Sequence, residues 1–111
     1  MEIKFKIWLE KGGRPVVGKG GVSLLREIER TGSISKAAHN LGMSYKFAWD
    51  YVSKIREELG EVVSKRGRET GGSSLTPQLE MVLEIYEEAE VEVRNVLDKY
   101  EAKLKELIGD P

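Results

Sequence analysis

The sequence has 111 residues, of which 40% are hydrophobic, with no cysteine and one histidine, His39. This length suits one folded domain with a modest core, and the composition excludes disulfides, thiolate metal sites and histidine clusters. No apolar run approaches the roughly 20 residues of a membrane span.

The net charge of −1 conceals two unlike parts. Residues 1–77 carry 14 Lys and Arg against 9 Asp and Glu, whereas residues 78–111 carry 4 against 10. Such asymmetry predicts a basic part that faces a polyanion and an acidic part that faces away from it. Because the chain opens on a charged, alternating segment and not on a secretory leader, we expect a cytoplasmic protein.

The first part of the chain predicts one strand and one helix. Residues 2–10 alternate between apolar side chains, beginning with Ile3 and Phe5, and exposed positions that include Trp8. This alternation predicts a half-buried strand. A loop over residues 11–21 is expected from its glycines and proline, followed by a helix over residues 22–32 that ends at a glycine.

Two short helical patterns follow, separated by Gly42. The first can be capped by Ser33 or Ser35 and the second by Ser44. Glycine permits the sharp reversal between them, so the pair predicts a helix-turn-helix. The predicted buried stripe of the first helix is Ile34, Ala37, Ala38 and Leu41, and that of the second is Ala48, Val52, Ile55 and Leu59.

The second of these helices has the pattern of a recognition helix, whose first residues must be free to meet base edges in the major groove. Its predicted outward side chains can bond bases or phosphates. The helix before it adds candidates for the DNA backbone. An alternative for the two aromatic residues is packing in the core or in a dimer interface. The recognition candidates are Ser44, Tyr45, Lys46, Trp49 and Ser53, and the backbone candidates are Ser33, Ser35 and Lys36.

A hairpin is predicted next, with strands near residues 62–66 and 73–76 and a glycine-rich tip. Lys65, Arg66 and Arg68 gather beside this tip. A basic wing next to a recognition helix contacts DNA backbone or the minor groove. The alternative for these charges is a solvated loop tip.

The last helix is predicted to begin at Thr76-Pro77, with Thr as cap and Pro in the first turn, and to run to about Ile108. At 1.5 Å per residue it would be about 45 Å long, too long for one small core to cover. Its apolar residues follow heptad spacing and predict a dimer seam. We therefore divide the chain into a DNA-binding domain, residues 1–76, and a dimerisation helix, residues 77–111. The predicted seam is Leu79, Leu83, Tyr86, Val93, Leu97, Tyr100, Leu104 and Leu107.

The run GSISKAAHNLGMSYKFAWDYV, followed by a Gly-rich hairpin and SSLTP, resembles the amino-terminal domain of ModE, the molybdate-responsive transcriptional regulators. That domain is itself similar to the DNA-binding domain of LysR-type regulators. The resemblance covers about residues 3–85. It implies a mainly α fold with a small β-hairpin: a winged helix-turn-helix with an N-terminal strand and a long C-terminal dimerisation helix. It also implies a homodimer on a palindromic operator, and it places the recognition and wing candidates at DNA-contacting positions.

Members of that family continue into an oxyanion-binding domain, whereas this sequence ends at Pro111. We therefore expect no oxyanion-binding domain, no cofactor and no metal, and find no evident small-molecule effector. The predicted function is sequence-specific binding of double-stranded DNA by a homodimeric transcriptional regulator that is not an enzyme and not a membrane protein. The main alternative is a winged-helix module that docks proteins and has lost DNA binding.

Two enzymatic interpretations are weaker. Residues 13–20 nearly match a phosphate-binding loop, but Gly20 stands where the magnesium-ligating Ser or Thr belongs. A hydrolase would need His39 as its base, and that histidine falls on the outer side of a short helix.

Overall fold

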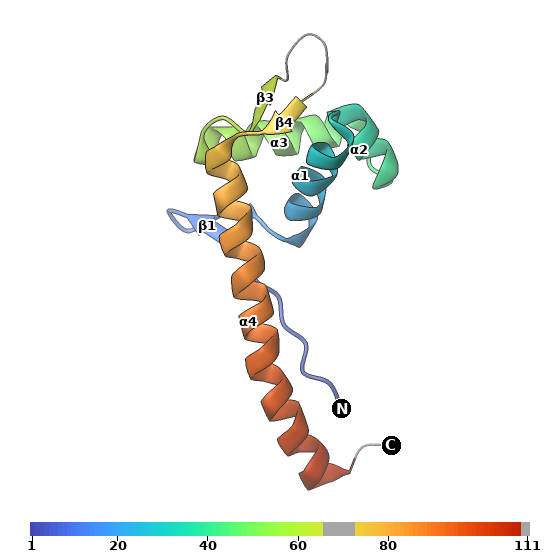
Figure 1. Ribbon diagram of the computed structural model, residues 1–111, viewed down its shortest axis with the longest axis vertical. Helices are drawn as coiled ribbons and strands as arrows, with labels where there is room; N and C mark the ends of the chain where they lie inside the picture. The colour runs from blue at the N-terminus through green and yellow to red at the C-terminus, as the bar shows by residue number, and fades with distance from the viewer. Residues whose placement is uncertain (66–72, 110–111) are drawn as a thin grey trace.

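The computed structural model describes residues 1–65 and 73–109. It is mainly helical and elongated, 59 × 31 × 23 Å, with a compact cluster of helices at one end and a single long helix leading away from it (Figure 1). The expected mainly α fold with a long C-terminal helix is therefore confirmed. In chain order the elements are β1 (Leu9–Lys11), β2 (Arg14–Val17), α1 (Lys19–Thr31), α2 (Ile34–Asn40), α3 (Tyr45–Leu59), β3 (Val63–Lys65), β4 (Ser73–Leu75) and α4 (Pro77–Ile108).

The helix-turn-helix forms where the sequence predicts it. The Oγ of Ser33 accepts a hydrogen bond from the Lys36 amide at 3.1 Å and so caps α2. Ser44 caps α3 in the same way, accepting from the Phe47 amide at 3.0 Å. Between the helices Gly42 adopts a φ of 70°, which residues with a Cβ rarely tolerate. These local features fix where each helix starts and how sharply the chain turns.

The core lies at the compact end and joins all four helices. Its largest fully buried side chains include Leu24 and Ile28 of α1, Ile55 of α3 and Leu83 of α4. Ala37 and Ala38 are also buried, and their small size lets α2 approach α1 and α3 closely. Each buried Leu or Ile contributes roughly 1.5–3 kcal/mol, so this cluster positions α3 rigidly.

Helix α1 starts at Lys19, earlier than the sequence predicts, and it therefore includes Gly21. Close packing against α3 explains this glycine. A Cβ built on Gly21 would lie 2.5 Å from the Tyr51 Oη. Glycine therefore allows α1 and α3 to meet at this point, and the packing between the helices outweighs its poor helix propensity.

The predicted strand over residues 2–10 is wrong in extent, because only Leu9–Lys11 pairs as β1. Its partner is β2, antiparallel, in a segment expected to be a loop. Gly12 and Gly13 make the turn with φ of 59° and 79°. A two-residue glycine turn is typical of a hairpin, but Pro15 is unfavourable in a strand, so the sequence did not predict one. Proline is tolerated at this position because the two-stranded ribbon leaves its edges unpaired.

The first eight residues run extended beside α4 (Figure 1). The predicted alternation is confirmed, since Ile3, Phe5 and Ile7 are half-buried while the intervening residues are exposed. The Tyr86 hydroxyl donates to the Ile7 carbonyl at 3.0 Å. This segment is thus attached to the helix and not to a sheet.

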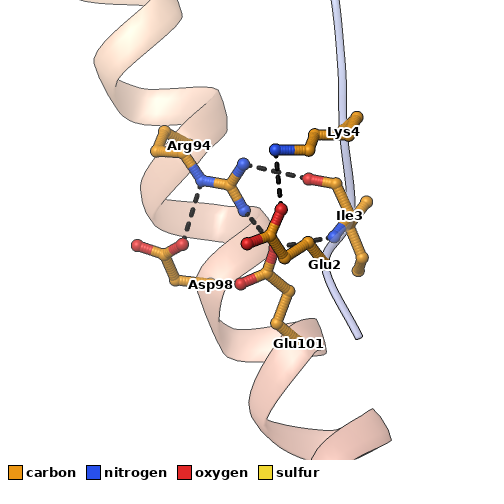
Figure 2. A network of polar contacts seen from close by, with 6 residues as sticks. All are labelled: Glu2, Ile3, Lys4, Arg94, Asp98 and Glu101. Atoms are coloured by element: carbon orange, nitrogen blue, oxygen red, sulfur yellow. Dashed lines mark hydrogen bonds and ion pairs between the residues drawn. The ribbon is translucent and has the colours of Figure 1, made fainter.

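Arg94 holds the far end of the same segment, as Figure 2 shows. Its guanidinium donates to the Ile3 carbonyl at 2.9 Å and to Glu101 at 2.8 Å. The Ile3 amide in turn donates to Glu101 at 2.6 Å. The Arg94 guanidinium also lies 5.5 Å from the centre of the Phe5 ring, a cation–π contact.

The first part of the predicted dimer seam requires correction. Leu79, Leu83 and Tyr86 are 2%, 0% and 2% exposed in the single chain, and they pack in its own core. They leave no side-chain surface for a partner, because α1, α3 and the N-terminal segment already cover this side of α4. The division of the chain at residue 76 stays a prediction.

A charged network also ties α4 to α1. Arg26 donates to Glu80 at 2.6 Å and to Glu29 at 2.9 Å, and it pairs with Glu87 through two nitrogens. The hydrogen bond with Glu87 raises the Arg26 pKa, and those with Glu80 and Glu29 add to the effect. Three carboxylates thus share one guanidinium at the junction of the two helices.

Candidate nucleic-acid interface

The N-terminal half of α3 presents its predicted outer face to solvent. Tyr45 is 56% exposed and Trp49 is 44% exposed, whereas Ala48 and Val52 of the same helix are buried. The packing of Tyr45 or Trp49 in the chain's own core is therefore excluded. The two rings stand one helical turn apart and form an aromatic surface at the start of the helix.

Lys46 lies on the same exposed surface. Its ammonium pairs with Asp50 at 2.7 Å, one turn further along α3. The hydrogen bond to Asp50 and its charge raise the Lys46 pKa, which favours the charged form of the side chain. An exposed pair of this kind is screened by water and salt, so a phosphate or a base can replace the carboxylate.

The capping serines remain able to bind a ligand. The Ser44 and Ser33 oxygens each accept one bond from the helix backbone, and each hydroxyl still has its own hydrogen to donate. Ser35 and Lys36 are exposed in the first turn of α2, whereas Ser53 is half-buried on α3. Ser35 and Lys36 are thus open to solvent, as is the start of α3, whereas Ser53 is partly covered.

The wing is present as a strand pair at the same end of the molecule (Figure 1). β3 and β4 are antiparallel, with Val63 opposite Leu75. Thr76 joins this ribbon to α4, since its amide donates to the Val62 carbonyl at 3.0 Å and its hydroxyl donates to the Glu61 carbonyl at 2.7 Å. Lys65 belongs to β3, and Arg66 and Arg68 lie outside the described residues.

The acidic part of the chain lies away from this surface. α4 carries most of the carboxylates of residues 78–111, and it runs from the wing toward the opposite end of the molecule (Figure 1). A polyanion that approaches α2, α3 and the wing therefore avoids most of the negative charge.

Sequence reasoning missed two exposed residues of α3. Phe47 is 56% exposed although it is a large apolar residue, and Lys54 is exposed two turns later. Helical periodicity could have predicted this exposure, because neither residue falls on the buried stripe of α3. Phe47 therefore cannot pack in the core.

The enzymatic alternatives find no support in the geometry. Residues 14–17, which lie inside the candidate phosphate-binding loop, form an antiparallel strand instead of a loop, and His39 is exposed. Within residues 1–65 and 73–109, no group of acidic or histidine side chains could hold a metal ion. None of the helices in this described part could cross a membrane.

Comparison with known proteins agrees with this geometry. Residues 21–80 match the bacterial regulatory helix-turn-helix proteins of the LysR family. The chain is 35% identical over 91 residues to the molybdenum transport protein ModE of Azotobacter vinelandii, covering 79% of this chain and 34% of that protein. It is 39% identical over 99 residues to the molybdenum-pterin-binding protein MopB of Rhodobacter capsulatus, covering 86% of this chain and 36% of that protein.

The transcriptional regulator ModE of Haemophilus influenzae is 38% identical over 69 residues, covering 60% of this chain and 27% of that regulator. The aligned segments thus span about a third of the length of these relatives. The resemblance to ModE regulators is confirmed, and regulators of this kind are typically non-enzymatic. The matched residues contain α2, α3 and the wing, and the chain therefore belongs to the LysR family of helix-turn-helix proteins, with a DNA-binding domain of the LysR/ModE type.

Proposed function

We propose that this protein is a sequence-specific, double-stranded DNA-binding transcriptional regulator that acts as a homodimer. The observation that carries the proposal is the exposed start of α3, where Tyr45, Lys46 and Trp49 face solvent. A recognition helix uses these first-turn positions to reach base edges in the major groove.

Each group has a chemical role in this proposal. Lys46 donates to guanine O6 and N7 or to a phosphate, and Trp49 offers apolar contact to a thymine methyl. Tyr45 and the Ser44 hydroxyl bind phosphate, while Ser33, Ser35 and Lys36 fix the register on the backbone. In the wing, the residues proposed to contact the DNA backbone or the minor groove are Lys65, Arg66 and Arg68. No catalytic step is assigned to any of them.

We place the dimer contact on the second half of α4. Val96 is 49% exposed, Tyr100 51% and Leu107 82%. Their spacing of four and seven residues puts them on one face of the helix. From the predicted seam, Val93, Leu97 and Leu104 are half-buried at the edge of this face. A second copy that covers these side chains would remove them from water.

A symmetric dimer built in this way places two copies of α3 on one side of a duplex. Half-sites then lie about 34 Å apart, one turn of DNA, or a multiple of that distance. The operator is therefore expected to be an inverted repeat. The molybdenum-related names of the relatives are not transferred, because the aligned spans cover about a third of those proteins.

The proposal is tested by selection of bound fragments from a random duplex pool. Enrichment of an inverted repeat supports it, and enrichment of nothing favours a protein-docking module. The selected duplex then serves to compare Lys46→Ala with Lys99→Ala, a control on exposed α4. We expect the first to lose about tenfold in affinity and to relax base preference at one position in each half-site, and the second to change little.

A further inference from the structure

We propose that a cleft between the N-terminal segment and α3 binds a planar aromatic anion. The cleft has a volume of about 640 Å³ and lies between Trp8 with β2 on one side and Phe47 with Tyr51 on the other. Small-molecule sites typically occupy about 300–1,000 Å³. The available volume is thus that of a ligand site.

The walls of this cleft are aromatic. Trp8 is 49% exposed and Phe47 is 56% exposed, so both rings offer free faces. The Phe47 and Tyr51 rings meet edge to face with their centres 6.2 Å apart. Val16 and Val17 also line the cleft and are almost fully buried. Rings that converge on an apolar floor favour a flat aromatic guest, which can stack on or abut them.

The cleft carries charges of both signs, but its two ammonium groups have no partner among the residues that the structure describes. Of its two carboxylates, Asp50 is bound by Lys46 at 2.7 Å, and Glu10 accepts from the Trp8 indole at 2.6 Å. No hydrogen bond or ion pair joins the ammonium of Lys6 or of Lys54 to any residue that the structure describes. Two free ammonium groups beside satisfied carboxylates complement an anionic ligand, such as an aromatic carboxylate.

The cleft is held open by contacts outside it. Lys11 donates to the Glu58 carbonyl at 2.6 Å, and Arg14 pairs with the carboxylate of Glu58 at 3.0 Å, which anchors the β1–β2 hairpin to the end of α3. Tyr86 fixes the segment just before Trp8 through the Ile7 carbonyl. A ligand therefore enters a preformed site, with little ordering of the protein on binding.

This site adjoins the proposed DNA-contacting face, because Asp50 at its edge pairs with Lys46, but its aromatic walls lie on another side of α3. Phe47, Asp50 and Lys54 follow one another at three and four residues and share one stripe of α3. Tyr45 and Trp49 lie on a neighbouring stripe of the same helix. Ligand binding can therefore be tested without DNA, and its outcome does not depend on the proposed function.

The test is titration calorimetry of the full chain with 2-naphthoate and with its neutral analogue 2-naphthalenemethanol. We expect saturable binding at one site per chain, with the anion about five- to tenfold tighter, because both lysines are partly screened by water. Phe47→Ala is expected to weaken both compounds by about tenfold or more, and Lys54→Gln to weaken only the anion.

Two control variants test whether binding is located in the cleft. Lys99→Gln removes an exposed charge from α4, and Ile85→Ala removes an apolar side chain that is 65% exposed on the same helix. Both should leave binding unchanged. The proposal is overturned if neither compound binds saturably, if the two bind equally, or if Ile85→Ala abolishes binding while Phe47→Ala does not. Circular dichroism checks that the variants remain folded, which the exposure of Phe47 favours.

Discussion

The two halves of α4 carry the same spacing of apolar residues but meet different surroundings. In the first half, Leu79, Leu83 and Tyr86 are covered by the chain's own helices. In the second half, the extended N-terminal segment lies alongside, and Tyr100 and Leu107 remain exposed. A heptad pattern therefore shows which residues share a face, but it does not show whether the same chain or a second copy covers that face.

The largest contrast between the halves is expected in stability. Leu83→Ala should lower the free energy of unfolding by about 2–5 kcal/mol, because it opens a cavity in the core. Leu107→Ala should cost less than about 0.5 kcal/mol, since that side chain is already 82% exposed. Urea denaturation at one low protein concentration gives both values. Equal losses would contradict the contrast.

For the association of two copies, we expect the second half of α4 to matter more than the first. Tyr100→Asp places a charge on the exposed apolar face and should yield monomers by sedimentation velocity, because that charge would be buried in the proposed dimer. Ala102→Asp, on another exposed side of the helix, introduces the same charge and should leave the dimer intact. A tight dimer of Tyr100→Asp would remove this face from the interface.

A smaller effect concerns the segment that covers one side of the second half. Arg94→Met removes the donor that holds the Ile3 carbonyl and positions Glu101. Amide exchange at Ile3 is expected to become about tenfold faster, as for a locally frayed terminus. Asp98→Ala removes an Arg94 partner that is not hydrogen-bonded to Ile3, so Ile3 should exchange at nearly its original rate. Unchanged exchange in Arg94→Met would show that other contacts hold the segment.

The smallest effect lies at the junction of α1 with the first half. The hydrogen bond with Glu80, together with burial, raises the Glu29 pKa above its ordinary 4.5. A raised pKa means that the folded protein binds this proton more tightly than the unfolded chain, so the ionised Glu29 costs stability at neutral pH. Glu29→Gln should therefore stabilise the protein at pH 7, by about 0.5 kcal/mol or less, because water screens a side chain that is 37% exposed.

The pH dependence gives the sign of this effect. The Glu29→Gln gain should disappear as the pH falls below about 4.5, where Glu29 is protonated in both states. Glu80 behaves oppositely, since its contacts with Glu29 and Arg26 lower its pKa. Glu80→Gln should therefore lose stability at pH 7. Thermal melts of both variants from pH 4 to pH 7 separate the two cases, and a gain for Glu80→Gln would reverse the assignment.

The helix-turn-helix was predictable because its signals are local. Ser33, Ser44 and Gly42 act through the residues next to them, so the caps and the turn appear where the sequence places them. The β1–β2 hairpin was missed because Pro15 is unfavourable in a strand, and only the tertiary contacts of Lys11 and Arg14 with α3 show why it forms. The division of the α4 seam depends on the same kind of long-range contact.

For the candidate interface, helical periodicity predicted the exposure of Tyr45 and Trp49 correctly. Periodicity did not identify the pairing of Lys46 with Asp50, although the i, i+4 spacing permits it. The cleft beside Phe47 brings together residues near positions 8, 16 and 47. No local pattern joins segments so far apart in the sequence.

The most direct test of the account is amide NMR of the isotope-labelled protein titrated with its selected duplex. We predict that the largest shift changes fall on Ser33–Lys36 and on Ser44–Trp49, with small changes over residues 91–108 of α4. In this account, the start of α3 binds DNA and the second half of α4 pairs with a second copy. It would be contradicted by shift changes centred on the second half of α4, or by unchanged amide shifts at the start of α3 at saturating duplex.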